Sequence, residues 1–194
     1  MPWLTPIDLQ DHRLLLTPVS PANQDGLAMT ATLDTFSFYT SYPKRFDGQG
    51  FYEWIMTRTA DPQVTYAMID LESKEVVGCS CMFDASEANR KLEIGYTWIA
   101  ENRRQTWVNP TSKLLMLSHA FETLGCNRVQ LKTDSRNLQS RAAILKLGAS
   151  FEGLLRQSFV MPDGFVRDTA YFSIIRAEWP DVKQRILDRL KSLY

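Results

Sequence analysis

The unit that runs from Leu92 to Gly125 limits the possible folds more than any other part of the chain. Its first residues alternate as a β-strand does, and residues 103–108 form a polar loop. Asn109 and Pro110 then favour a helix start, because asparagine caps helices and proline suits the first helical position. An apolar helical stripe follows and ends at the glycine. This order of strand, loop and helix indicates a mixed α/β domain.

Strands and helices also alternate along the rest of the chain. The other predicted strands are residues 13–19, 64–71, 76–83, 129–134, 151–160 and 167–175. The other predicted helices are residues 20–33, 51–56, 138–147 and 180–194, and we expect the last helix to be peripheral. No repeat or linker divides the sequence. We therefore expect one domain over residues 1–194, with a core at about residues 13–176 and a mixed sheet flanked by helices.

Charge and composition exclude several classes of function. The chain has 22 lysines plus arginines and 22 aspartates plus glutamates, a balance that argues against a dedicated nucleic-acid binder. No apolar run approaches the roughly 18 residues that span a bilayer. The first residues lack the basic start and apolar block of a signal peptide. With three cysteines and no disulfide framework, we expect a cytoplasmic protein whose partners are neither nucleic acid nor membrane.

The cysteines allow two other interpretations, and the sequence favours neither. Cys79 and Cys81 share one face of a predicted strand, but no second Cys/His pair completes a metal site. We expect small core residues and no metal. A nucleophilic Cys126 would need a nearby base, and His119 has no recognisable partner.

The loop at residues 103–108 is a candidate anion site. A helix N-terminus offers unpaired N–H groups and a partial positive charge, which together bind phosphates. Arg103 and Arg104 add positive charge. The loop is neither a Walker loop nor a dinucleotide fingerprint, because it contains no glycine. A surface loop with two solvated arginines is the alternative.

Several short sequence motifs lie before, within and after this loop, and their order along the chain is informative. They are Glu93-Ile94-Gly95-Tyr96-Thr97-Trp98, Thr106-Trp107-Val108-Asn109, His119-Ala120-Phe121-Glu122, Lys132-Thr133-Asp134, Asn137-Leu138-Gln139-Ser140 and Lys146-Leu147-Gly148-Ala149. Their order and spacing resemble the GNAT N-acetyltransferases, and in particular the Rim-type branch, named for N-terminal acetylation of ribosomal proteins. The resemblance runs from about Arg13 to Trp179. It implies the GNAT fold, a mostly antiparallel mixed sheet with two splayed parallel strands at the acyl-CoA site.

The resemblance also implies which residues meet the coenzyme. Family members usually carry Arg/Gln-x-x-Gly-x-Gly/Ala in the pyrophosphate loop, where this chain has Arg104-Gln105-Thr106-Trp107-Val108-Asn109. Trp107 and Asn109 thus replace small residues that let backbone approach a phosphate, a form that resembles a variant within the Rim-type branch. The implied coenzyme contacts are Trp98, Ile99, Arg104, Gln105, Thr106, Trp107, Val108, Asn109 and Asn137.

The implied reaction is acetyl transfer from acetyl-CoA to a primary amine, by direct transfer in a ternary complex. Glu93 is the candidate base, because a partly buried carboxylate has a raised pKa and can take a proton through a water. We place it on the strand face opposite Tyr96 and Trp98. Ile144 stands where many GNAT members have a tyrosine, and isoleucine cannot donate a proton. The Rim-type resemblance implies a serine one turn after the Asn cap in its place, so Ser140 is the candidate acid. A solvated or salt-bridged glutamate and an ordinary helix serine are the alternatives.

Other functions and partners stay open. The missing glycines would also suit a non-catalytic acyl-CoA-binding or regulatory module, and Arg103 or Arg104 could meet the extra carboxylate of succinyl-CoA. The acceptor is a peptide N-terminus or a small amine, whose entrance the aromatic segments 36–46 and 51–54 could wall. A homodimer through an exposed last strand or the terminal helix is a further option.

Overall fold

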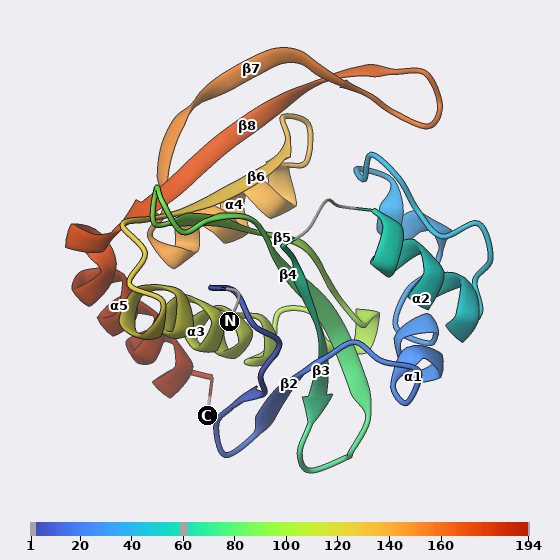
Figure 1. Ribbon diagram of the computed structural model, residues 1–194, viewed down its shortest axis with the longest axis horizontal. Helices are drawn as coiled ribbons and strands as arrows, with labels where there is room; N and C mark the ends of the chain where they lie inside the picture. The colour runs from blue at the N-terminus through green and yellow to red at the C-terminus, as the bar shows by residue number, and fades with distance from the viewer. Residues whose placement is uncertain (1–2, 59–61, 194) are drawn as a thin grey trace.

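The computed structural model describes residues 3–58 and 62–193. Within them, one eight-stranded sheet has the order β1-β2-β3-β4-β5-β6-β8-β7 (Figure 1). Neighbouring strands pair antiparallel, except that β5 (Lys91–Ile99) and β6 (Arg128–Asp134) are parallel. The predicted mixed, mostly antiparallel sheet is confirmed.

The predicted strands are all present, with ends that shift by a few residues. The remaining strands are β1 (Leu9–Gln10), β2 (Leu14–Pro18), β3 (Val64–Asp70), β4 (Val76–Ser86), β7 (Ser150–Val160) and β8 (Val166–Ile175). Strand β1 was not predicted, because two residues are too short to show an alternating pattern.

The helices are α1 (Gln24–Ala28), α2 (Gly48–Thr57), α3 (Val108–Ser118), α4 (Leu138–Leu147) and α5 (Trp179–Lys191). Short 3-10 turns lie at η1 (Leu33–Phe36), η2 (Glu101–Arg103) and η4 (Arg176–Glu178), and α3 continues into a π-helical turn, η3 (His119–Thr123). The helix predicted at residues 20–33 is wrong in length. The Asn23 side chain accepts from the N–H of Ser20 and donates to the carbonyl of Pro18, so these residues form a turn instead.

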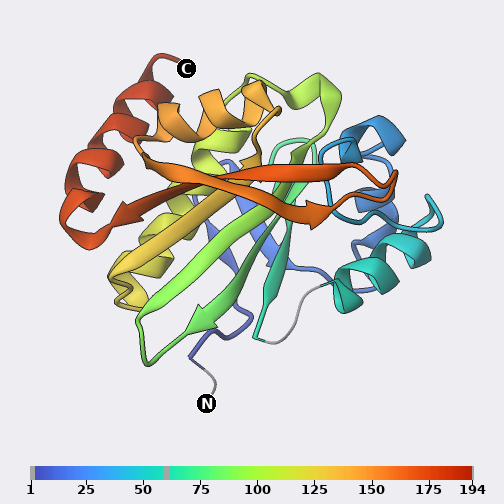
Figure 2. The ribbon, with the colours of Figure 1, turned by 90° about the horizontal axis from the view of Figure 1, so that it is seen from above.

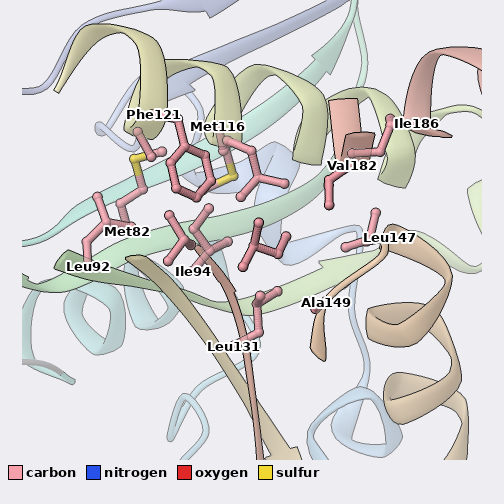
Figure 3. Packing of buried hydrophobic residues seen from close by; sticks show 14 of the residues in the cluster. Met82, Leu92, Ile94, Met116, Phe121, Leu131, Leu147, Ala149, Val182 and Ile186 are labelled. Atoms are coloured by element: carbon pink, nitrogen blue, oxygen red, sulfur yellow. The ribbon is translucent and has the colours of Figure 1, made fainter. Parts of the chain in front are cut away.

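The sheet separates two hydrophobic cores. Helices α3 and α5 cover one face, and α1 and α2 cover the other (Figures 1 and 2). Figure 3 shows the larger core, in which side chains from the sheet meet those of α3, α4 and α5. The smaller core is rich in aromatic rings, and includes Phe36, Phe51, Trp54 and Trp98. Several rings of the segments 36–46 and 51–54 therefore serve packing, whereas Tyr42 and Phe46 are exposed.

Helix α5 is part of the larger core, so the prediction of a peripheral helix is wrong. Trp179, Val182, Ile186 and Leu190 are each at most 6% exposed. Their spacing places them on one side of the helix. The ring of Trp179 also stacks on Phe121 with centroids 5.3 Å apart. The polar residues on the opposite side of α5 are the reason that the sequence suggests a peripheral helix.

A bulge interrupts β5. Tyr96 and Thr97 together lie opposite Ser80 of β4, and Tyr96 has a φ of 48°. A tyrosine in this left-handed region is uncommon, because its Cβ crowds the backbone. The extra residue breaks the strict alternation of side chains along the strand.

The bulge overturns the predicted faces of β5. Leu92 and Ile94 pack in the larger core, whereas Trp98 packs in the smaller core on the opposite side of the sheet. An unbroken period of two would have placed Leu92, Ile94, Tyr96 and Trp98 on one face, and the extra residue of the bulge prevents this.

The cysteines Cys79, Cys81 and Cys126 are buried and form no disulfide. In the described part of the chain, no group of three or more His, Cys, Asp or Glu side chains is placed to hold a metal ion. The same residues contain no helix that combines the length and the apolar character needed to cross a membrane.

Candidate active site

Strands β5 and β6 separate immediately after Glu93 and Gln130. The parallel register ends at this pair, whereas β6 pairs with β8 along its whole length. Residues 94–99 of β5 and 131–134 of β6 therefore do not pair with each other. Backbone groups along such an opening can pair with an extended ligand as with an added strand.

Helix α3 begins at Val108 rather than after an Asn109 cap, so the predicted start is wrong by two residues. Trp107 takes the N-cap position, and its carbonyl accepts from the N–H of Thr111 at 3.0 Å. The hydroxyl of Thr106 accepts from the N–H of Val108 at 3.4 Å. The threonine thus satisfies an N–H at the helix start, and Asn109 lies within the first turn.

Trp107 does not obstruct the loop backbone as its size suggests. Its indole is 8% exposed and packs in the larger core, with the Arg13 guanidinium 4.2 Å from the ring centroid. Gln105 has a φ of 61°. Among the described residues, no acceptor pairs with the N–H groups of Gln105, Thr106 and Trp107. These groups and the start of α3 form a local concentration of N–H donors suited to an anion.

The two arginines of the loop have different environments. Arg103 forms an ion pair with the buried Asp70 at 3.2 Å and approaches Glu75 at 3.8 Å. Arg104 is exposed, and its Nε donates to the carbonyl of Ile99 at 3.3 Å. The alternative interpretation of two solvated arginines is wrong for Arg103, whose ion pair connects the loop to β3. Arg104 keeps further guanidinium donors at the loop surface.

Glu93 is a buried carboxylate at the point where the strands separate. It is 2% exposed, and its Oε2 accepts from Gln130 Nε2 at 2.9 Å and lies 3.1 Å from Lys132 Nζ. Burial raises the pKa of Glu93 above its ordinary value, although the Lys132 charge and the Gln130 bond act in the opposite direction. Its other oxygen, Oε1, accepts no hydrogen bond from the described residues. The carboxylate is therefore both salt-bridged and able to accept a proton.

Aromatic rings share the sheet face of Glu93. Phe83 lies opposite Glu93 in the register, and the ring of Tyr96 is 5.1 Å from that of Phe83. Trp54 and Tyr39 contact Tyr96 in turn, with centroids 6.4 Å and 6.2 Å away. The prediction that Glu93 faces away from Tyr96 is wrong, because the bulge turns the tyrosine ring to this side.

The start of α4 agrees with the sequence. Asn137 Oδ1 accepts from the N–H of Ser140 at 2.9 Å, so the predicted cap is confirmed. Ser140 is half-buried, and its hydroxyl forms no hydrogen bond within the described residues. Ile144, one turn later, is 7% exposed and packs in the larger core. No recorded interaction joins Ser140 to Glu93.

Trp98 and Ile99 are the predicted coenzyme residues of β5, and both side chains are engaged in packing. The indole of Trp98 is 4% exposed, and its Nε1 donates to the hydroxyl of Thr30 at 2.8 Å. Ile99 packs against the larger core.

A family model described as an acetyltransferase (GNAT) domain matches residues 13–150. The chain belongs to the GNAT acetyltransferase family. The predicted GNAT fold is confirmed. The prediction that the chain is an acyltransferase is confirmed at the level of the family.

Two relatives of this GNAT acetyltransferase come from Bacillus subtilis (strain 168). YoaA, an uncharacterized N-acetyltransferase, is 30% identical over 172 residues, which are 87% of this chain and 96% of YoaA. YdaF, whose name assigns it provisionally as a ribosomal N-acetyltransferase, is 31% identical over 106 residues. That match covers 55% of this chain and 57% of YdaF, little more than half of either protein.

Solved structures are similar over nearly the whole chain. A GCN5-related N-acetyltransferase from Brucella melitensis has a TM-score of 0.87 and 26% identity, over 97% of this chain and 87% of that one. Mycobacterium smegmatis RimJ, solved in complex with CoA-disulfide, has a TM-score of 0.76 and 19% identity, over 95% and 93%. The second likeness shows the fold. The names YdaF and RimJ agree with the Rim-type resemblance.

Sequence reasoning missed Gln130 and Lys132 as partners of the carboxylate in this GNAT acetyltransferase. A signal for them existed, because both alternate with apolar residues along a predicted strand. What the sequence did not supply was the parallel register that sets Gln130 beside Glu93.

Proposed function

We propose that this chain transfers the acetyl group of acetyl-CoA to a primary amine, directly, within a ternary complex. The buried Glu93 carboxylate, with one oxygen unpaired, carries the proposal, since it lies where β5 and β6 separate. A base at that position can serve an amine that attacks a thioester held between the two strands. The name of YdaF, assigned provisionally as a ribosomal N-acetyltransferase, and the Rim-type resemblance favour a protein N-terminus as the acceptor, and a small amine is the second acceptor class.

The residues present fit the coenzyme. In the proposal, the diphosphate binds to the N–H groups of Gln105, Thr106 and Trp107 and to the Arg104 guanidinium, while Val108 and Asn109 form the helix start beneath it. The packing of the Trp107 indole in the larger core supports this, because the ring is directed into the core.

Two further contacts belong to the pantetheine arm. The backbone of Trp98 and Ile99 would pair with it as a neighbouring strand does. Asn137 uses its side-chain oxygen as the α4 cap, so its amide N–H groups remain available to the coenzyme.

The chemical step needs a base, an oxyanion donor and a stabilised leaving group. The amine nitrogen attacks the thioester carbon and gives its proton, through a water, to Glu93. A backbone N–H of the β5 bulge donates to the developing oxyanion. As the carbon–sulfur bond breaks, the Ser140 hydroxyl donates a hydrogen bond to the thiolate, which takes its proton from solvent. Glu93 then releases its proton to solvent, so that the amide product and free CoA leave the site with the base regenerated.

The test measures thiol release from acetyl-CoA with peptides that have free N-termini and with small amines. In Glu93→Gln the amide keeps its size but cannot take the proton. We expect kcat to fall about a hundred- to ten-thousand-fold while the dissociation constant for CoA stays unchanged. Glu87→Gln, at an exposed turn, is the matched control and keeps full activity. An unchanged kcat in Glu93→Gln would remove this residue from the mechanism.

The same assay separates the alternatives. CoA binding without thiol release from any amine would favour a non-catalytic module, a reading that the buried Ile144 at the usual acid position supports. Faster release from succinyl-CoA than from acetyl-CoA would indicate another acyl donor. Of the two arginines considered for a succinyl carboxylate, Arg103 already pairs with Asp70, which leaves Arg104.

A further inference from the structure

Lys113 is a buried cation without a carboxylate partner. It lies on α3 and is 4% exposed. Its Nζ donates to the hydroxyl of Thr97 at 2.7 Å and to the hydroxyl of Ser80 at 2.9 Å, and these two hydroxyls are 2.7 Å apart. In the described part of the chain, no carboxylate lies within ion-pair distance of Nζ. Burial of an unpaired ammonium opposes folding, and an apolar side chain of similar size would fill the same space.

The contacts of Lys113 end on the β5 bulge. Thr97 is one of the two bulged residues, and the Ser80 hydroxyl that it shares with Lys113 also approaches the carbonyl of Gly95 at 3.5 Å. The bulge is therefore bonded to α3 and to β4 on the side of the larger core.

The bulge is also held from the opposite face of the sheet. The Tyr39 hydroxyl donates to the carbonyl of Thr97 at 2.8 Å. The ring of Tyr96 packs against Phe83 and Trp54 on this same side. Thr97 is thus fixed twice, through its hydroxyl by Lys113 and through its carbonyl by Tyr39.

The conformation that these contacts hold is costly. A non-glycine residue in the left-handed region is strained, and it persists where its surroundings over-determine it. Tyr96, with a φ of 48°, is such a residue, and it follows Glu93 by a few positions on the strand edge that opens toward β6. Bulges beside active sites commonly change the direction of a backbone or side-chain group.

We infer that Lys113 is a positioning residue, which with Ser80 and Thr97 fixes the β5 bulge so that its backbone N–H meets the thioester oxygen. This role rests on the proposed function. It differs from a role in coenzyme binding, because the proposed diphosphate-binding site is the loop before α3. Loss of the Lys113 amine therefore lowers kcat and leaves the affinity for CoA nearly unchanged.

Lys113→Met tests the inference, since methionine fills the space without the amine. We expect kcat to fall about ten- to hundred-fold, part of the effect of losing an oxyanion donor, with an unchanged dissociation constant for CoA. Lys146→Met, at an exposed position on α4, is the control and keeps wild-type kcat. Thermal unfolding of Lys113→Met should match or exceed the wild-type midpoint, which separates lost positioning from lost folding. An unchanged kcat in a folded Lys113→Met overturns the inference.

A double-mutant cycle shows whether Lys113 acts through Thr97. We expect Thr97→Val to lower kcat and Thr97→Ser, which retains the hydroxyl, to keep kcat near the wild-type value. In the Lys113→Met/Thr97→Val double variant, kcat should fall no further than in the more strongly affected single variant. Falls that multiply would mean that the two residues act independently, and would contradict the inference.

A second readout keeps this result separate from the proposed function. If the wild-type protein releases no thiol with any amine, the proposed reaction fails. The effect of Lys113 on the bulge can then be measured from the NMR chemical shifts of the backbone amides. Lys113→Met should shift the amide signals of Tyr96 and Thr97, whereas Lys146→Met should leave them in place. Unshifted signals in Lys113→Met would reject the role of Lys113 in either case.

Discussion

Glu93 Oε2 lies 3.1 Å from Lys132 Nζ, at the last paired position of the two parallel strands. The lysine is on β6 and the glutamate on β5, so the ion pair bridges the strands at the point where they begin to diverge. An attractive cation beside a buried carboxylate limits how far its pKa can rise. The pair therefore sets the pH range in which Glu93 can act as a base.

The first prediction concerns the pH dependence of kcat/KM. The base must be ionised, so activity falls as pH drops through the pKa of Glu93, which burial holds above the ordinary 4.5. Lys132→Met removes the favourable charge and raises this pKa further. We expect the acidic limb of the profile to move to higher pH, whereas Lys146→Met leaves it in place. A limb that stays in place or moves to lower pH would contradict the role of the ion pair.

The second prediction separates the two loop arginines. Arg104→Gln should weaken CoA binding and reduce its salt dependence, because an exposed guanidinium near the diphosphate is lost. Arg103→Gln should instead lower the free energy of unfolding by about 1–3 kcal/mol, since the buried Asp70 loses its partner. Calorimetric titration and urea unfolding of both variants measure the two effects. A reversed assignment would show that Arg103 is the coenzyme ligand.

The third prediction tests whether α5 belongs to the core. Ile186 is 1% exposed, so Ile186→Ala should lower the free energy of unfolding by about 2–5 kcal/mol. Leu145→Ala, at a residue that is 49% exposed, should change it by less than about 0.5 kcal/mol. Urea unfolding compares the two. Equal small effects would mean that α5 is dispensable for stability.

The fourth prediction uses the buried lysine as a pH probe. Lysine titrates near 10.5 in the unfolded chain, and burial lowers the pKa of Lys113 to about 7 in the folded protein. Between these values the unfolded chain binds more protons, so the contribution of this group to stability rises with pH. Any advantage of Lys113→Met over wild type in unfolding free energy should therefore be largest below pH 7 and should shrink as pH rises toward 10.

The neighbouring titratable groups do not blur this measurement. Burial raises the pKa of Cys79 to about 12 and also raises the pKa of Cys81 above its ordinary value, and both thiols are present in wild type and in Lys113→Met, so their titration enters both sides of the comparison. A pH-independent difference between Lys113→Met and wild type would show that the lysine does not titrate as a buried group.

Local sequence patterns predicted the elements of this fold well, because strands, caps and glycine stops depend on neighbouring residues. The Asn137 cap and the stop at Gly148, which has a φ of 101°, are examples. Patterns failed where a distant partner decides. The bulge at Tyr96 and Thr97 is hydrogen-bonded, through Thr97, to Tyr39 and Lys113, which lie far away in the sequence.

The candidate site was predictable in part for the same reason. Glu93 stood out as a carboxylate within a strand, and its burial agrees with that interpretation. Its ion pair with Lys132 depends on strand order, which the spacing of short motifs does not reveal. The bulk of Trp107 suggested a blocked loop, and only the structure shows that its ring packs in the core, beside Arg13.

The most direct test of the account is a calorimetric titration of the wild-type protein with coenzyme A. The account predicts saturable binding at one site per chain, with pantetheine, which lacks the diphosphate, binding far more weakly. Absence of heat and of saturation at millimolar coenzyme A would contradict it, because Glu93 would then have no thioester beside which to act.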